Sequence, residues 1–249
     1  MGSHVSHGII AKKFGAEMKQ LNLAAKEYDQ IHSLLERLST NVRDQLRELK
    51  KAATDEDVVK LRQIVERDRD IDSLELDLNR RARSFIELRA PLGPDFRSLM
   101  QVVQIASNLE RIGDCTEYVA RHIATSFQLK TAMPEGWDLI ANMIAKCLEL
   151  LDLSHAAWQR TDAQLAERLP HQDEEVDLLQ KHARQLMIAQ VRAGKIDVEL
   201  GLELVLIANK LESIADISSH IAESVVFVVQ ARQIRHEKRK SPLAEPTKG

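Results

Sequence analysis

Residues 105–120 read IASNLERIGDCTEYVA, and residues 207–222 read IANKLESIADISSHIA. Seven of the 16 aligned positions are identical, and they include the pattern Leu-Glu-x-Ile-x-Asp. A looser match lies upstream, where Asp68-Arg-Asp-Ile-Asp72 corresponds to Asp173-Glu-Glu-Val-Asp177. The second copies follow the first by 102 residues (110 to 212) and by 105 residues (68 to 173). Because both matches keep the same order at similar offsets, the sequence predicts an internal duplication.

Residues that break helices are scarce in this chain. Its 9 Gly and 6 Pro make up about 6% of 249 residues, against an average of roughly 12%. A strand-rich fold needs a turn every 8–12 residues or so, and this chain has too few Gly and Pro residues to make them. The composition therefore excludes a β-sandwich or barrel and disfavours a nucleotide-binding α/β fold. Apolar residues are 44% and charged residues 29%, which is enough apolar material for a packed core.

Apolar residues recur at helical spacing between the few breakers, as at Leu61, Ile64, Val65, Ile71, Leu74 and Leu78. Six helices are predicted, at about 8–51, 54–89, 94–129, 135–160, 162–193 and 195–232. The expected fold is all-α, with two tandem three-helix bundles related by duplication, residues 7–130 and 135–232. A basic, flexible tail is expected at residues 233–249.

Local signals place some of the helix ends. The acidic stretches Thr54–Asp57 and Thr161–Asp162 are typical helix starts. Pro170 lies inside the fifth predicted helix and should kink it or mark a false start.

Composition also excludes several classes of function. Net charge −3, a pI near 6.3 and 4% aromatic residues argue against a nucleic-acid binder. Cys115 and Cys147 are too few for a disulfide framework or a four-thiolate zinc site. The sequence has no apolar run of the ~18 residues that a membrane span needs, and no secretory signal opens it. We therefore expect a cytoplasmic protein with reduced thiols and no transmembrane segment.

Each repeated segment carries an acid-x-x-x-acid pair. Residues four apart share a helix face, where two like charges destabilise the helix by a few tenths of a kcal/mol. A hard cation reverses that repulsion, because carboxylate oxygens are its ligands. If two such helices face each other, four carboxylates converge in each repeat. The predicted metal ligands are Asp68, Asp72, Glu110 and Asp114 in the first repeat, and Asp173, Asp177, Glu212 and Asp216 in the second.

The spacing alone carries little information, because seven such pairs occur in the chain and chance predicts about as many. A lone pair of this kind is usually a solvated helix face. The signal is the register, since four of the seven pairs fall in matched places of the duplicated unit. Gly113, inside a helix and beside one pair, indicates a close approach of another group, because Gly costs about 1 kcal/mol there relative to Ala.

No catalytic apparatus is evident. A ferritin-type di-iron centre needs Glu-x-x-His pairs, which this sequence lacks. The nearest forms, Asp29/His32 and Asp152/His155, are out of register with the repeat and are interpreted as surface polar residues. We expect no enzyme. Two alternatives to a non-enzymatic metal-binding protein stay open, a carboxylate-bridged metal-dependent enzyme and a purely structural helical scaffold.

Several segments of the sequence resemble those of a known protein family. Residues 106–114, ASNLERIGD, are similar to the signature of the PhoU phosphate-signalling regulators, which recurs in both halves of that family. Pro91-Leu-Gly-Pro-Asp95-Phe-Arg97 resembles the family's turn before the third helix, and residues 233–236 resemble its closing segment. The resemblance covers about residues 7–236.

The resemblance implies two tandem three-helix bundles with one multinuclear metal cluster each. Iron or zinc is implied first, with magnesium or manganese as alternatives, held by the eight acids named above. It further implies a negative regulator of the phosphate-starvation response, coupling the ATPase subunit of the phosphate ABC transporter to a membrane sensor histidine kinase. Such a protein would be a homodimer peripheral to the membrane and would bind no nucleic acid.

The sequence departs from the family's pattern beside the motifs. Ser213 and Ala215 stand where the family usually has Arg and Gly. The residue after the motif Asp is often His in the family, and here it is Cys115 in the first repeat and Ile217 in the second. The Asn usually found four residues after that Asp is replaced by Tyr118 and His220. His220 is either a further ligand or a polar residue at the bundle edge.

Overall fold

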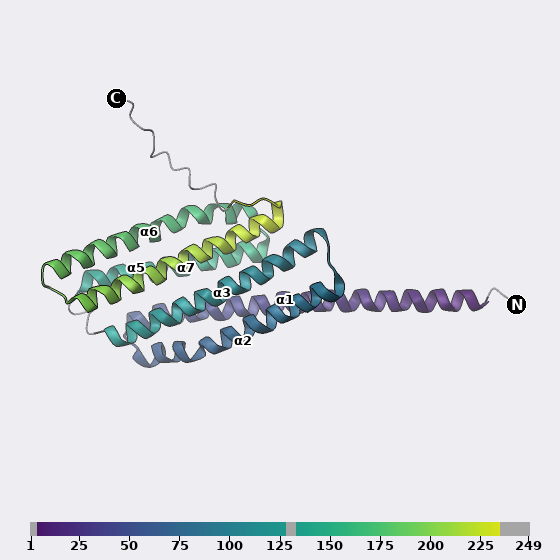
Figure 1. Ribbon diagram of the computed structural model, residues 1–249, viewed down its shortest axis with the longest axis horizontal. Helices are drawn as coiled ribbons and strands as arrows, with labels where there is room; N and C mark the ends of the chain where they lie inside the picture. The colour runs from purple at the N-terminus through teal and green to yellow at the C-terminus, as the bar shows by residue number, and fades with distance from the viewer. Residues whose placement is uncertain (1–3, 128–132, 235–249) are drawn as a thin grey trace, which may run out of the picture.

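A computed structural model describes residues 4–127 and 133–234, with side chains from residue 22 onward. Within these ranges the chain forms six helices and no strand (Figure 1). The helices are α1 (His4–Asp55), α2 (Val58–Arg89), α3 (Gly93–Ser126), α5 (Pro134–Arg160), α6 (Ala163–Arg192) and α7 (Val198–Gln230). All six lie within a few residues of the predicted ranges.

The helices form two three-helix bundles that lie side by side. α1, α2 and α3 make up the first bundle and α5, α6 and α7 the second, while α3 packs against α7 and α1 against α5 (Figure 1). One continuous core runs through both, from Ile31 in α1 to Ile221 in α7. The predicted pair of duplicated bundles is therefore confirmed, and the two halves share one hydrophobic interior.

The core follows from the helical periodicity of the apolar residues. In α1 the residues Leu35, Leu38, Val42, Leu46 and Leu49 recur every three or four positions, and each is at most 1% exposed. The sequence limits expected for the two halves remain predictions. The predicted flexible tail lies outside the described residues apart from Gln233 and Ile234, and Ile234 is buried.

Aspartates cap three of the helices at their N-termini. Asp57, Asp162 and Asp197 each accept a hydrogen bond from the backbone N–H three residues on, at 3.0, 2.9 and 2.7 Å. The predicted start at Thr54–Asp57 is right for Asp57 and wrong for Thr54. The Thr54 hydroxyl donates to the carbonyl of Lys50, so Thr54 belongs to the last turn of α1.

Four of the described helices end on residues other than glycine in the left-handed conformation. Glu56, Ala90, Thr161 and Ala231 have φ of 57°, 45°, 53° and 54° and follow α1, α2, α5 and α7. This is how a chain with so few glycines still makes its turns. Pro170 does not mark a false start, because α6 is helical from Ala163 to Arg192 with Pro170 buried inside it.

A polar contact joins the two bundles where α1 meets α5. Asp152 accepts hydrogen bonds from Arg43 (2.6 Å) and Arg47 (2.7 Å), and the Ser39 hydroxyl lies 2.8 Å from Nδ1 of His155. The interpretation of Asp152 and His155 as a surface pair is therefore wrong for His155, which is only 7% exposed. Its role here is structural, because it fills the contact between the repeats.

Candidate metal centres

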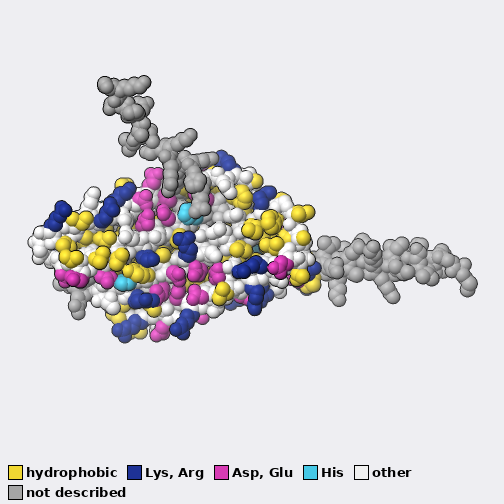
Figure 2. All heavy atoms as spheres, viewed as in Figure 1, with side chains coloured by type: hydrophobic (Ala, Val, Ile, Leu, Met, Phe, Trp, Pro, Cys, Tyr) yellow, Lys and Arg dark blue, Asp and Glu magenta, His cyan; other side chains and the backbone are white. Residues whose placement is uncertain are grey.

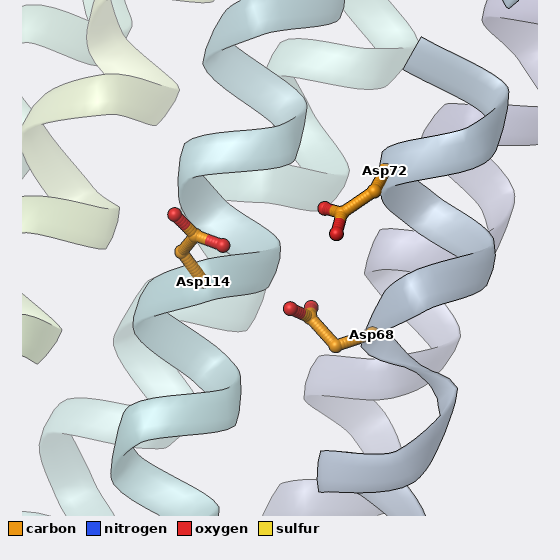
Figure 3. A group of neighbouring side chains, drawn as sticks. All are labelled: Asp68, Asp72 and Asp114. Atoms are coloured by element: carbon orange, nitrogen blue, oxygen red, sulfur yellow. The ribbon is translucent and has the colours of Figure 1, made fainter. Parts of the chain in front are cut away.

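The first repeat brings three of its four predicted ligands together. Asp68 and Asp72 point from α2 toward α3, from which Asp114 comes (Figure 3). One carboxylate oxygen of each lies within 4.8 Å of the others. Glu110 lies one turn before Asp114 and outside this closest group. The three carboxylates of the group nevertheless help to raise the pKa of Glu110. The register of the repeat therefore predicts the first cluster correctly as a group of facing carboxylates.

Gly113 sets the distance between the two helices that carry the cluster. A Cβ built at this position would lie 3.2 Å from Oδ1 of Asp68 and 3.2 Å from two side-chain carbons of Ile71. The close approach indicated by a mid-helix glycine is thus confirmed, and the neighbour is a candidate ligand. At the equivalent position in the second repeat stands Ala215, which is 1% exposed, so a methyl group is accommodated there.

Burial and mutual repulsion raise the pKa of three acids in and beside the first cluster. Burial, together with the nearby carboxylates, raises the pKa of Asp68 to about 6 and the pKa of Glu110 to about 7. The pKa of Asp114 is also raised, first by burial and then by Asp72 and Glu117. Such a group of acids favours either bound protons or a bound cation at neutral pH.

Two residues beside the first cluster were not identified from the sequence. Gln45 of α1 donates a hydrogen bond to Asp68 at 3.3 Å, while its own buried Oε1 has no hydrogen-bond partner among the described residues. Glu75 lies one turn beyond Asp72 and accepts hydrogen bonds from Asn79 and Ser107. The sequence spacing could have identified Glu75, because Asp68, Asp72 and Glu75 follow one another at helical spacing on the same face of α2.

The second repeat forms an equivalent cluster. Asp177 of α6 and Glu212 and Asp216 of α7 each place a carboxylate oxygen within 4.8 Å of the other two. Asp173 is outside this closest group and only 9% exposed. The pKa of Glu212 is raised by burial and then by Asp216, Asp177 and Asp173, so the other three predicted acids all act on Glu212. The outlying member differs between repeats, being Glu110 of α3 in the first and Asp173 of α6 in the second.

The residues that depart from the family's pattern contribute little to these clusters. Burial raises the pKa of the Cys115 thiol, and a protonated thiol is a poor ligand. Ile217 is 3% exposed and packs in the core. Tyr118 stacks on His122 with ring centroids 4.1 Å apart. His220 is absent from the group of described residues that could hold a cation at Asp177, Glu212 and Asp216.

The donor set fits a hard cation. Three carboxylates per cluster meet without a nitrogen or sulfur donor in the group, which suits oxygen-loving metals better than soft ones. Gln45 adds a buried acceptor oxygen without a partner among the described residues, next to Asp68. The absence of a Cβ at Gly113 lets the Asp68 carboxylate lie close to α3, where a methyl group would force it to shift. These features match what a cation between α2 and α3 requires.

Fold and clusters together define a class of protein, a duplicated three-helix bundle with an equivalent acidic cluster in each half. A family model described as the PhoU domain matches residues 35–123 and 140–225, so each half carries one copy. The chain belongs to the PhoU family.

Named relatives agree with this assignment. A phosphate-specific transport system accessory protein PhoU homolog from Zymomonas mobilis is 28% identical over 186 residues, covering 73% of this chain and 76% of the relative. The homolog from Pseudomonas aeruginosa is 25% identical over 227 residues, covering 91% of this chain and 89% of the relative.

Solved structures share the fold. The crystal structure of PhoU from Pseudomonas aeruginosa matches with a TM-score of 0.77 and 24% identity, covering 84% of this chain and 99% of the other. The phosphate transport system regulatory protein PhoU from Streptococcus pneumoniae matches with a TM-score of 0.74 and 18% identity, covering 85% of this chain and 99% of the other. Among the helices of the described residues, none has both the length and the apolar character needed to cross a membrane.

Proposed function

We propose that this protein is a negative regulator of the phosphate-starvation response. It would act as a cation-binding adaptor between the ATPase subunit of a phosphate ABC transporter and a membrane sensor histidine kinase, at the cytoplasmic face of the membrane. Family membership supports the link to phosphate transport, since the relatives are named as accessory proteins of that system. The same names favour a regulatory role over an enzymatic one.

One observation carries the cation-binding part of the proposal. Each of the two repeats places three carboxylates within 4.8 Å of one another, and two of the three positions, Asp72/Asp177 and Asp114/Asp216, are equivalent in the duplicated unit. Without a cation, the acids of each cluster repel one another, and this repulsion lowers the stability of the fold at neutral pH. A bound cation would remove that repulsion and brace α2 against α3 and α6 against α7. Iron or zinc clusters are proposed first, and magnesium or manganese as alternatives.

Exposed apolar side chains support a role in protein–protein contact. Large hydrophobic residues are exposed around the α2–α3 turn at Leu88, Leu92, Phe96 and Met100, with Leu92 at 84%. Figure 2 shows hydrophobic side chains gathered on the visible face toward one end of the bundle. Exposed apolar surface of this kind commonly marks a partner-binding site, and we also propose that the protein is a homodimer.

The adaptor role is tested by pull-down from cells grown in high and low phosphate. The bait is the wild-type chain, the double variant Asp114→Asn/Asp216→Asn, or the control Asp77→Asn, an acid of α2 outside the cluster. We expect the transporter ATPase and the sensor kinase to be captured in a phosphate-dependent manner by wild type and the control, and lost with the double variant. Capture that ignores both phosphate and the cluster substitutions would contradict the proposal.

The metal and the oligomeric state need separate measurements. Elemental analysis combined with native mass spectrometry should show bound metal and a dimer in protein purified without chelator. A metal-free protein whose thermal stability ignores both chelator and added metal would refute the cation-binding part and leave the family assignment untouched.

A further inference from the structure

A buried glutamine of α1 reaches the first acidic cluster. Gln45 is 5% exposed and lies among the core residues of α1, of which Val42 and Leu46 are fully buried. Its Nε2 donates a hydrogen bond to Oδ1 of Asp68 at 3.3 Å. The same Oδ1 is the atom that a Cβ at Gly113 would meet at 3.2 Å. One carboxylate oxygen of the cluster thus lies where α1, α2 and α3 come together.

The amide of Gln45 is poorly satisfied by its protein neighbours. Its Oε1 is buried and accepts no hydrogen bond from any residue that the structure describes. The bond from Nε2 to Asp68 is longer than the usual N–H···O distance of about 2.9–3.0 Å. A buried acceptor without a donor costs free energy, and this cost can exceed what one hydrogen bond contributes. Contacts within the protein therefore do not explain why a glutamine stands here.

The duplication shows that this buried position does not require an amide. An offset of 102 residues (45 to 147) places Cys147 of α5 at the position of Gln45, and Cys147 is fully buried. The same offset pairs the buried Val42 with the buried Ile144. The Cys147 thiol donates to the backbone carbonyl of Leu211 at 3.0 Å. The equivalent position thus takes a smaller side chain that bonds to the backbone, whereas Gln45 meets a carboxylate.

A cation would satisfy the amide oxygen together with the carboxylates. Amide oxygens of Asn and Gln are ligands of hard cations and add a donor without adding charge. Two oxygens that share a cation at about 2.1–2.6 Å and a right angle lie about 3.0–3.7 Å apart. The amide atom of Gln45 nearest to Oδ1 of Asp68 lies at 3.3 Å, within this range. Half a turn of the amide would bring Oε1 to that place.

We propose that Gln45 is an oxygen ligand of the cation in the first cluster. Its amide donates to Asp68 in the cation-free protein and turns its oxygen to the cation on binding. This inference rests on the proposed cation-binding function and adds a ligand from outside the acid-x-x-x-acid pairs. The cation then joins all three helices of the first bundle, because its ligands come from α1 (Gln45), α2 (Asp68 and Asp72) and α3 (Asp114).

The test measures Mn²⁺ binding at the first cluster. Glu212→Gln/Asp216→Asn serves as the parent, because it neutralises two acids of the second cluster while keeping their shape. On this parent, Gln45→Met removes the oxygen from an unbranched side chain of similar length, and Gln45→Glu keeps an oxygen and adds a charge. Gln159→Met is the matched control, since Gln159 also donates to a carboxylate, that of Glu36 at 3.0 Å, between α5 and α1.

Isothermal titration calorimetry should show Mn²⁺ binding about tenfold weaker with Gln45→Met than with the parent, and at least as tight with Gln45→Glu. Gln159→Met should leave the Mn²⁺ affinity unchanged. In chelator, the Tm of Gln45→Met should equal that of the parent or exceed it, because a buried oxygen without a donor has been removed. The Tm of Gln45→Glu in chelator should be lower, because a further acid then lies beside Asp68.

The outcomes separate this inference from the function on which it rests. Equal Mn²⁺ affinity in Gln45→Met and the parent would overturn the role of Gln45 and leave cation binding intact. Equally weakened binding in Gln45→Met and Gln45→Glu would overturn it too, since an oxygen at this position would then be irrelevant. Mn²⁺ binding by wild type but not by the parent would also overturn it. Absence of Mn²⁺ binding in both would contradict the cation-binding proposal itself.

Discussion

Gly113 of α3 lies against Asp68 of α2 so closely that a single methyl group would touch the carboxylate. The Cβ that an alanine would add lies 3.2 Å from Oδ1 of Asp68, a tighter contact than such atoms normally make. The same Cβ would also lie 3.2 Å from side-chain carbons of Ile71. The glycine thus serves both the packing of two helices and the geometry of the candidate metal centre.

Gly113→Ala should therefore weaken cation binding more than it weakens the fold. Alanine in a helix interior is favoured over glycine by about 1 kcal/mol, which offsets part of the contact with Ile71. The Asp68 carboxylate has to shift, so we expect an affinity for Mn²⁺ at the first cluster about tenfold lower. Calorimetry measures the affinity, and urea unfolding in chelator should give a free energy of unfolding within about 1 kcal/mol of wild type.

The control for this prediction is the equivalent position of the other repeat. Ala215→Gly should cost about 1 kcal/mol of stability through helix propensity and leave Mn²⁺ binding at the first cluster unchanged. Unaltered affinity in Gly113→Ala would show that the close approach matters for packing alone.

The sequence was sufficient to predict the helices, the duplication and the facing acids. Helical periodicity determines which side of each helix is buried, and the repeat offset pairs the acids of α2 with those of α3. The sequence could not show which three of four acids meet. That outcome depends on side-chain rotamers and on the helix separation, which reflects the close approach at Gly113 in the first repeat.

Contacts between the repeats were also beyond prediction. Ser39 and His155 are 116 residues apart, and the pairing of Tyr118 with Lys210 depends on how far α3 slides along α7. Periodicity specifies a face and not the partner that the face meets. For this reason the sequence predicts a surface position for His155, although His155 is buried.

The metal-free protein should lose stability as the pH rises through neutrality. The pKa of Asp68 rises from 3.8 to about 6 on folding and that of Glu110 from 4.5 to about 7, so the folded state holds protons that the unfolded state releases. This contribution is fully present below about pH 4 and is lost as the pH rises through 6 to 7. After discounting for solvent screening, we expect a loss of the order of 2 kcal/mol between pH 5 and pH 8.

Urea unfolding in chelator at several pH values checks this dependence. The variant Asp68→Asn/Glu110→Gln lacks both titrating groups and should show a flatter profile, with a gain in stability at pH 8. Saturating Mn²⁺ should stabilise wild type at pH 8 more than at pH 5, because a cation and protons compete for the same oxygens. A double variant with the same slope as wild type would assign the pH dependence to other groups.

Thr161→Gly should stabilise the protein. Thr161 ends α5 with φ of 53°, a conformation that is unfavourable for a β-branched residue and easy for glycine. Its backbone N–H still caps the helix by donating to the carbonyl of Trp158, and glycine keeps that bond. We expect a gain of about 1 kcal/mol, seen as a higher urea midpoint at unchanged m-value. Thr161→Ala, which keeps a Cβ, should recover much less of this gain.

Asp152 should contribute more to stability than other exposed acids, because it joins the two repeats. It accepts from Arg43 and Arg47 of α1, and the Arg43 side chain is only 18% exposed. Asp152→Ala leaves both guanidinium groups without this partner, and we expect a loss of about 1–2 kcal/mol. A double-mutant cycle with Arg43→Ala should give a coupling of about 1 kcal/mol that shrinks as salt is added.

Asp77→Ala is the matched control for this prediction. Asp77 also pairs with two arginines, Arg80 and Arg81, but within α2 itself. Its loss should stay near 0.5 kcal/mol, as for ordinary pairs within a helix, and equal losses at positions 77 and 152 would show that Asp152 does not specifically hold the repeats together.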